Sequence, residues 1–259
     1  MNIILLQPDE ICNNLAEIKG RRLRHILRIL KSCPDDRLRI GIINGPLGIG
    51  TIRAIDRTRM LLEIKTENTK PLRPEIDLVL ALPRPIMLKR LLSQATGMGI
   101  ARLFLINAAR VEKSFFKASI LEQENYRRYI YRGLEQAVDT LVPEISIHPR
   151  FKPFVKDILP ELCCQASHCL LAHPDGRERL TELVPVPLQG RILVAIGPEG
   201  GWLDYEVKKF QEQKVQIFNM GKRILRVDTS VTAVLAQLDL LRHFKTSAEP
   251  FKSVKMQKH

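Results

Sequence analysis

The sequence predicts an α/β fold in which a parallel sheet follows a smaller, mainly β domain. From residue 76 onward, short apolar runs alternate with segments of helical periodicity. This pattern is typical of strands that are buried on both faces and covered by helices. The first 70 residues instead contain three short strand-like runs and one helical segment. The prolines in segment 70–74 disfavour both helix and sheet interior, so we expect a linker there.

The N-terminal part is expected to form a small barrel that carries one basic helix. Strands are predicted at residues 38–43, 49–55 and 59–65, with a turn at Asn44-Gly45-Pro46 between the first two. In segment 19–31, one helical face is apolar, with Leu23, Ile26, Leu27 and Leu30. Another face is basic, with Arg21, Arg24, Arg28 and Lys31, and the segment contains no acidic residue.

The C-terminal part is expected to supply the parallel sheet and its helices. Strands are predicted at residues 76–82, 103–106, 168–172, 192–196 and 215–218, and helices at 86–98, 119–138, 204–213 and 229–244. We expect Asp204 to cap the third of these helices, and Asp228, Thr229 or Ser230 to cap the last. The resulting domains are 1–72 and 73–245, followed by a basic tail at 246–259.

Composition points to a polyanionic partner. The 259 residues contain 41 Lys and Arg against 28 Asp and Glu, a net charge of +13 with a pI of about 9.8. Nucleic acid is the first candidate partner and a membrane surface the second. Five cysteines without regular spacing favour a reducing compartment. Because no apolar run is long enough for a membrane span or a signal segment, we expect a cytoplasmic protein with no membrane association.

Several common site patterns are missing from the sequence. There is no glycine fingerprint for a dinucleotide, no phosphate-binding loop ending in Gly-Lys-Ser/Thr, and no His-Glu-x-x-His. Cysteines and histidines gather between residues 163 and 173, but their spacing matches no zinc finger. We therefore expect buried structural thiols there and no metal site.

Two glycine-containing loops follow two of the predicted strands. Strand 192–196 leads directly into Gly197-Pro198-Glu199-Gly200-Gly201, and strand 215–218 leads into the basic loop 219–228. In open α/β sheets, ligands bind at the carboxyl ends of strands. A tight turn explains the first loop alone equally well, and a basic loop with a capped helix explains the second. Together, the two loops favour a binding site.

The segments IGPEGGW and NMGKRILRVDTSVTAVLAQL resemble the C-terminal signature of the bacterial 16S rRNA (uracil-N3)-methyltransferase family, within the SPOUT superfamily. The similarity extends to segment 25–55, which resembles the family's PUA-like domain. The resemblance implies a trefoil-knotted α/β domain, a homodimer, and S-adenosylmethionine as cofactor. The cofactor would lie against residues in three loops: Leu171, Ile196, Gly197, Glu199, Gly200, Gly201, Met220, Gly221, Arg223, Ile224 and Leu225.

The resemblance also implies a reaction at N3 of a uridine in small-subunit rRNA, within the 30S subunit. Loss of the N3 proton spreads negative charge over the neighbouring carbonyl oxygens, so a cation such as Arg226 or Arg223 could stabilise that charge and a carboxylate such as Asp228 could assist proton removal. We expect Arg226 to stabilise that charge and Asp228 to assist proton removal, although Arg226 can equally pair with Asp228 to hold the loop. For RNA binding we expect the basic residues Arg21, Arg22, Arg24, Arg28, Lys31 and Arg84.

The central region departs from the family pattern. Gly97 stands where the family has a glutamate, and Asp139 stands where it has an arginine. Two alternatives therefore stay open: a ribosome-assembly factor that binds the cofactor without this transfer, and a methyltransferase acting on another RNA.

Overall fold

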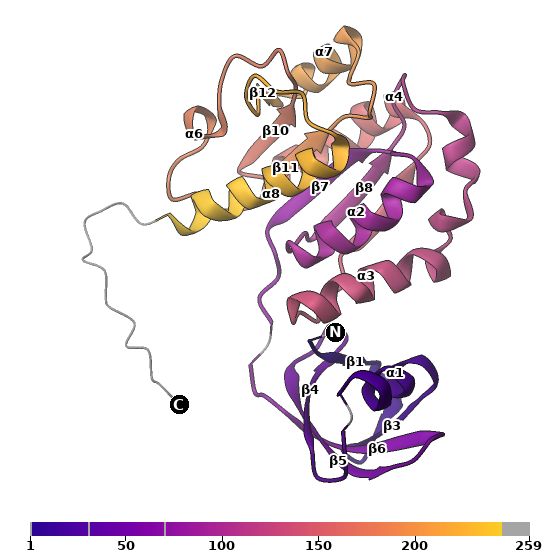
Figure 1. The fold of residues 1–259 in the computed structure, drawn as a ribbon. Coiled ribbons are helices and arrows are strands. Elements are labelled where there is room, and N and C mark those ends of the chain that lie inside the picture. The colour runs from indigo at the N-terminus through magenta and orange to yellow at the C-terminus, as the bar shows by residue number, and fades with distance from the viewer. Residues whose placement is uncertain (1, 31, 70, 245–259) are drawn as a thin grey trace.

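The computed structural model describes residues 2–30, 32–69 and 71–244, which form two six-stranded sheets joined near residue 70 (Figure 1). The Lys31 prediction and the tail prediction, from residue 245 on, lie outside the described residues.

The N-terminal sheet has the order β1-β4-β5-β6-β3-β2. Its strands are β1 (Ile4–Leu6), β2 (Ile11–Cys12), β3 (Leu15–Lys19), β4 (Arg37–Ile42), β5 (Leu47–Ile55) and β6 (Arg59–Thr66). Only β1 and β4 pair in parallel. The strands predicted near 38, 49 and 59 are confirmed within two residues. The first three strands have no sequence prediction; β1 and β2 are only three and two residues long.

The basic segment is not one regular helix. Helix α1 spans Gly20–His25 and continues as a π-helical turn over Ile26–Leu30. Leu23 and Ile26 are buried against the sheet, as the apolar face predicts.

Arg22 turns inward instead of standing free on the basic surface. Its guanidinium donates to the carbonyl of Leu5 at 2.8 Å and to both carboxylate oxygens of Glu10. Burial raises the pKa of Glu10, but hydrogen bonds from the Arg22 side chain and the Gln7 backbone outweigh that effect and hold the pKa below its usual value. Arg22 therefore supports the fold of the N-terminal sheet.

The C-terminal sheet is parallel throughout, with the order β12-β10-β11-β7-β8-β9. Its strands are β7 (Ile76–Ala81), β8 (Arg102–Ile106), β9 (Glu144–His148), β10 (His168–Ala172), β11 (Ile192–Ile196) and β12 (Gln216–Phe218). The predicted α/β class with a parallel sheet is confirmed. Strand β9 has no sequence prediction because it lies at the edge and is only half-buried.

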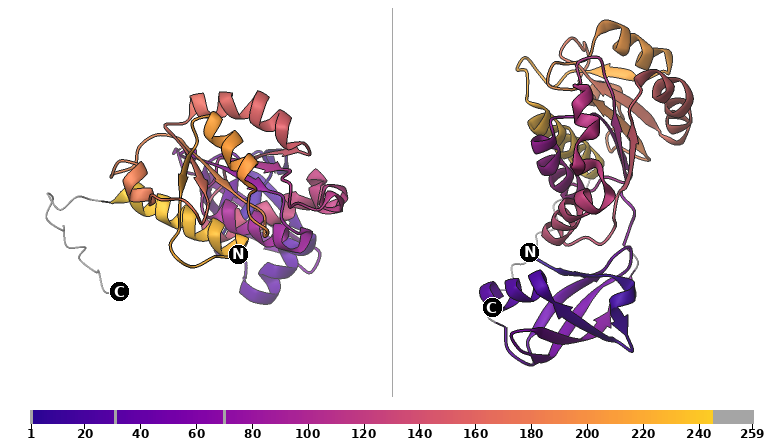
Figure 2. Two further views of the ribbon diagram at one scale, coloured as in Figure 1. Left: turned by 90° about the horizontal axis from the view of Figure 1, so that it is seen from above. Right: turned by 90° about the vertical axis from the view of Figure 1, so that its right-hand side faces the viewer.

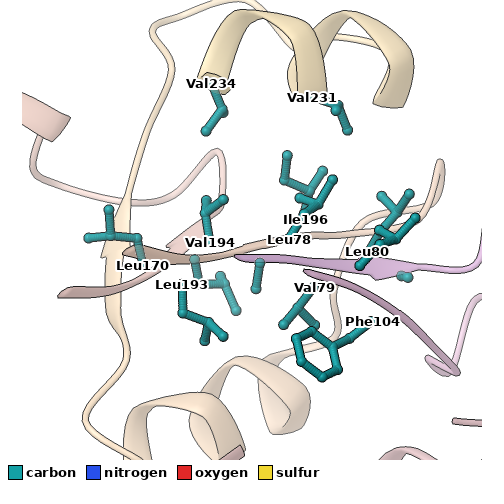
Figure 3. Close-up of a cluster of buried hydrophobic side chains, with 14 of the residues drawn as sticks. Leu78, Val79, Leu80, Phe104, Leu170, Leu193, Val194, Ile196, Val231 and Val234 are labelled. Atoms are coloured by element: carbon teal, nitrogen blue, oxygen red, sulfur yellow. The ribbon is translucent and has the colours of Figure 1, made fainter. Parts of the chain in front are cut away.

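Helices cover both faces of this sheet (Figures 1 and 2). On one face lie α2 (Pro85–Gly97), α3 (Gln123–Ala137) and α8 (Val227–His243); on the other lie α4 (Phe151–Pro153), α5 (Leu159–Gln165) and α7 (Asp204–Glu212). The short helix α6 (Leu180–Leu183) follows β10. Figure 3 shows Val231 and Val234 of α8 facing the central strands, while Val79 and Phe104 extend from the opposite face. This arrangement explains why the strands are apolar at nearly every position.

The N-cap residues of helices α7 and α8 differ from the predicted ones. Helix α8 begins at Val227 with Arg226 as its N-cap, not Asp228, Thr229 or Ser230. Helix α7 begins at Asp204, and the buried Glu206 accepts the backbone N–H of Leu203 at 2.9 Å. Glutamate at this position satisfies an N–H that has no partner within the helix, so the predicted cap at Asp204 is wrong.

The two sheets contact each other through α3. Ile130 and Leu134 of α3 pack against Ile3, Leu5 and Ile43. Backbone hydrogen bonds cross the same contact, from Asn2 to Glu135 at 2.9 Å and from Asn44 to Thr140 at 2.8 Å. None of the described helices is long and apolar enough to cross a membrane.

Candidate functional site

Three loops meet at the carboxyl edge of the parallel sheet. Strands β12, β10 and β11 are neighbours, and the register pairs Ala172 with both Ile196 and Phe218. The strands therefore end at the same level, and the segments after residues 172, 196 and 218 leave the sheet side by side. This is the edge at which open parallel sheets bind ligands.

The three loops enclose a cavity of about 530 Å³. It is lined by Arg84, Met87, Ala172, His173, Pro174, Ile196, Gly197, Pro198, Glu199, Gly201, Trp202, Met220, Gly221, Arg223, Ile224, Leu225, Arg226, Val227 and Ser230. The structure thus brings together nine of the eleven predicted cofactor residues, together with Arg226 and Arg84. Their contacts with a cofactor or with RNA stay a prediction.

Three of the predicted cofactor and catalytic residues do not line this cavity. Leu171 is fully buried inside β10, and the next residues along the chain, Ala172 and His173, face the cavity instead. The carbonyl of Gly200 accepts a hydrogen bond from Arg110. Asp228 lies in the first turn of α8, with Oδ1 3.5 Å from Nε of Arg226.

Glycine is favoured in the loop after β11, residues 197–201, because side chains approach its backbone closely. A Cβ atom on Gly197 would lie 3.0 Å from Nε1 of Trp202, and one on Gly200 would lie 2.8 Å from Cδ of Arg110. Gly201 has φ +75°, which side chains rarely permit. The indole of Trp202 is held in turn by the rings of Phe210 and Phe151, at centroid distances of 5.2 and 6.5 Å.

A fourth loop, after β8, braces the glycine loop. The fully buried carboxylate of Glu206 accepts N–H bonds from Ala109 at 2.8 Å and from Leu203 at 2.9 Å. Next to Ala109, Arg110 donates to Gly200. These two side chains tie loops that lie about ninety residues apart in the sequence, and nothing in the sequence pattern indicates that contact.

The side chain of Asn219 closes the loop that follows β12. Its amide donates to the carbonyl of Gly176 at 2.7 Å and accepts the N–H of Gly221 at 3.0 Å. Gly221 has φ +118°, so the chain turns here only because no side chain is present. The loop ends at Arg226, whose carbonyl accepts the N–H of Ser230 at 2.7 Å.

The charge around the cavity is mainly positive. Among the lining residues, Arg223 and Arg226 come from the loop after β12 and Arg84 precedes helix α2, against a single carboxylate, Glu199. The side chain of Arg226 is 71% exposed and that of Asp228 is 19% exposed, so their contact at 3.5 Å is a solvated ion pair. Such a pair leaves the guanidinium free to contact an incoming anion.

The N-terminal basic residues have different surroundings. Arg24 and Arg28 are exposed, whereas Arg22 is engaged with Glu10. The side chain of Arg21 and the whole of Lys31 lie outside the described part of the structure. In segments 2–30, 32–69 and 71–244, no three His, Cys, Asp or Glu residues gather as metal ligands do. Cys169 is buried in β10, Cys163 is half-buried and Cys164 is exposed, and all three are free thiols.

Comparisons with known proteins assign the chain to a family. Residues 69–239 match the RNA methyltransferase domain family. The chain is 31% identical over 246 residues to the ribosomal RNA small subunit methyltransferase E of Treponema pallidum. The matched region covers 91% of this chain and 90% of that protein. It is 26% identical to the protein of the same name from Synechocystis, over 92% of this chain and 77% of that protein.

The fold agrees with this assignment. A crystal structure of the ribosomal RNA small subunit methyltransferase E from Neisseria gonorrhoeae bound to S-adenosyl methionine superposes with a TM-score of 0.73. The similarity covers 92% of this chain and 98% of that chain, at 18% sequence identity. From the matched domain, the 31% identity and the common fold, we conclude that this chain belongs to the ribosomal RNA small subunit methyltransferase E family.

Proposed function

We propose that this protein transfers the methyl group of S-adenosylmethionine to N3 of a uridine in small-subunit (16S) rRNA. The observation that carries the proposal is the cavity of about 530 Å³ where three loops leave neighbouring parallel strands, in a chain of this family. The Treponema pallidum relative is named as a small-subunit rRNA methyltransferase, and the Neisseria gonorrhoeae structure holds S-adenosyl methionine.

The residues around the cavity fit this cofactor. Apolar side chains of Ile196, Met220 and Leu225 suit an adenine ring, and glycine backbone at 197, 201 and 221 gives a ligand close access to N–H and C=O groups. The bound cofactor would supply a methyl group on a positively charged sulfur, which needs orientation more than activation.

Arg226 and Asp228 are the proposed catalytic residues. N3 of uridine becomes a nucleophile only when its proton leaves, and the charge then spreads over two carbonyl oxygens. The exposed guanidinium of Arg226 at the cavity rim would stabilise that charge. Asp228 lies in the first turn of α8, where the helix N-terminus favours a carboxylate, and it would accept the proton.

We further propose the domain boundaries 1–72 and 73–245, with a PUA-like barrel in the first domain and a trefoil knot in the second. The knot is what the family resemblance implies; the chain runs out to β12 at the edge and then returns to cover β11 with α8, an order that a knotted domain would share. The basic residues Arg24 and Arg28 of the N-terminal domain would contact rRNA phosphates.

We propose a homodimer that acts on the 30S subunit in the cytoplasm. Exposed apolar side chains support the dimer: Ile86 is 70% exposed and Ile224 is 86% exposed. Ile224 lines the loop cavity, and Ile86 is the chain neighbour of Met87, which also lines it. A second copy packed over these side chains would remove them from water and close one side of the site.

The test uses 30S subunits from cells that lack this gene and S-adenosylmethionine with a tritiated methyl group. We expect one labelled 3-methyluridine, identified by nuclease digestion and mass spectrometry. Arg226→Ala should lose at least about a hundredfold in rate while the dissociation constant for S-adenosylhomocysteine changes little. The matched control is Lys222→Ala, an exposed cation in the same loop that does not line the cavity. Binding of the cofactor without any methylation of 30S subunits would contradict the proposal.

A further inference from the structure

A second cavity, of about 590 Å³, lies between the N-terminal sheet and helix α3. Its lining includes the polar side chains of Gln7, Glu10, Arg22, Arg128, Tyr131, Arg132 and Glu135. We call it the interdomain groove. It shares no lining residue with the cavity at the carboxyl edge of the parallel sheet.

Two guanidinium groups in the groove have no carboxylate partner. Arg128 and Arg132 are exposed, stand one helical turn apart on α3, and form no salt bridge with any described residue. Both lie near the ring of Tyr129, at 5.0 and 6.0 Å from its centroid. Contact with the ring restricts the two side chains, so less conformational freedom is lost when they bind an anion.

The acidic residues of the groove do not cancel this charge. Glu10 is held by Arg22 through both carboxylate oxygens, so these two side chains neutralise each other. The remaining charged groups of the lining are then two guanidinium groups, on Arg128 and Arg132, against one carboxylate, on Glu135. The groove therefore stays positive.

Groups that recognise a nucleotide base stand beside these arginines. The Gln7 amide donates to the hydroxyl of Tyr131 at 3.1 Å, which fixes the tyrosine ring at the groove wall. The hydroxyl proton of Tyr131 has no acceptor among the described residues. An aromatic ring, a free O–H donor and two guanidinium groups are the chemistry with which proteins bind unpaired RNA.

We propose that the interdomain groove binds a single-stranded segment of the RNA substrate, with Arg128 and Arg132 on its phosphates and Tyr131 beside a base. This inference rests on the proposed function, because it names where the same RNA is held away from the reacting uridine. Planar guanidinium groups match phosphate oxygens in a two-point contact. Arg24 and Arg28 of the N-terminal domain are also exposed.

The test compares Arg128→Ala, Arg132→Ala and the double variant with Arg127→Ala. Arg127 is exposed on the same helix and does not line the groove, so it controls for charge and for helix propensity. Affinity for fluorescein-labelled oligouridine is measured by fluorescence anisotropy over a salt series. Thermal unfolding checks that each variant is folded.

We expect the double variant to bind about tenfold more weakly, with wild-type affinity for Arg127→Ala. Two lost phosphate contacts should reduce the slope of log K against log salt by about 1.4. Equal losses in Arg127→Ala and the groove variants would indicate diffuse attraction and overturn the proposal, as would unchanged affinity in the double variant. Methylation of 30S subunits by the wild-type protein tests the proposed function separately. If the groove binds RNA but the wild-type protein does not methylate 30S subunits, the proposed function is contradicted and the groove proposal is not.

Discussion

Helices α2 and α3 pack closely at Gly133, and the structure allows the effect of Gly133→Ala on stability to be worked out. A Cβ atom on Gly133 would lie 2.5 Å from the backbone oxygen of Ser93 and 3.0 Å from Cβ of Thr96. Since real Cβ atoms essentially never lie closer than 3.0 Å, α2 or α3 has to move by at least 0.5 Å in Gly133→Ala. The hydrogen bond from Ser93 Oγ to the carbonyl of Tyr129, at 2.7 Å, crosses the same contact and would be strained.

Overpacking of this kind costs about 1–3 kcal/mol. Alanine in a helix interior regains about 0.5–1 kcal/mol relative to glycine. The net loss of unfolding free energy for Gly133→Ala therefore lies between about 0 and 2.5 kcal/mol, and the middle of that range is about 1 kcal/mol. For a protein of this size, a loss of about 1 kcal/mol lowers the melting temperature by about 2–4 °C.

Gly97 supplies the matched control at the same helix contact. A Cβ atom there would lie no closer than 3.5 Å to any neighbour, the backbone oxygen of Gly133. Gly97→Ala should therefore leave the melting temperature unchanged or raise it slightly. Differential scanning calorimetry of both variants is the assay. A Gly133→Ala protein as stable as wild type, or equal losses in the two variants, would refute the close-contact explanation.

Three further predictions concern the buried charges and the loop site. Asp77 is fully buried and accepts from two arginines at 2.6 and 2.9 Å, so Asp77→Asn should lower the unfolding free energy by about 2–3 kcal/mol in urea titrations. The folded-state pKa of Glu10 is depressed, so its stabilisation is present above the unfolded pKa and is lost as pH falls through the folded value. Wild type and Glu10→Gln should accordingly differ most at neutral pH and converge in acid, as chemical denaturation across pH will show. Gly197→Ala would press on Trp202, the only tryptophan, so we expect weaker S-adenosylhomocysteine binding by calorimetry and altered indole fluorescence; wild-type affinity would contradict the packing.

Sequence patterning predicted the elements whose burial is uniform. Strands β7, β10 and β11 are apolar at every position except Asp77 and His168 because both faces are covered, and all three are predicted within one residue. Segment 151–165 has no sequence prediction, because prolines at 153 and 160 interrupt its helical periodicity and the chain forms α4, a π-helical turn and α5. Polar and half-buried edge strands such as β9 give equally weak patterns.

The position of the loop site was predictable because a general rule places ligands at the carboxyl ends of parallel strands. Glycine and charge in segments 197–201 and 219–226 sufficed to choose two of the loops. The surroundings of individual side chains were not predictable. The sequence places Arg22 in a basic helical segment, but in the structure its guanidinium turns inward and donates to Glu10 and to the carbonyl of Leu5.

The sequence by itself determined the fold class, the strands of the core and the segments that form the loop site, because apolar periodicity and glycine act on neighbouring residues. Only the tertiary structure decided the strand order β12-β10-β11-β7, which brings three loops together. It also decided that Glu206 reaches Ala109 across 97 residues, and that Arg128 and Arg132 face a groove beside the N-terminal sheet. Such contacts depend on which elements pack side by side, and the free energy of that packing belongs to the whole chain rather than to any local segment.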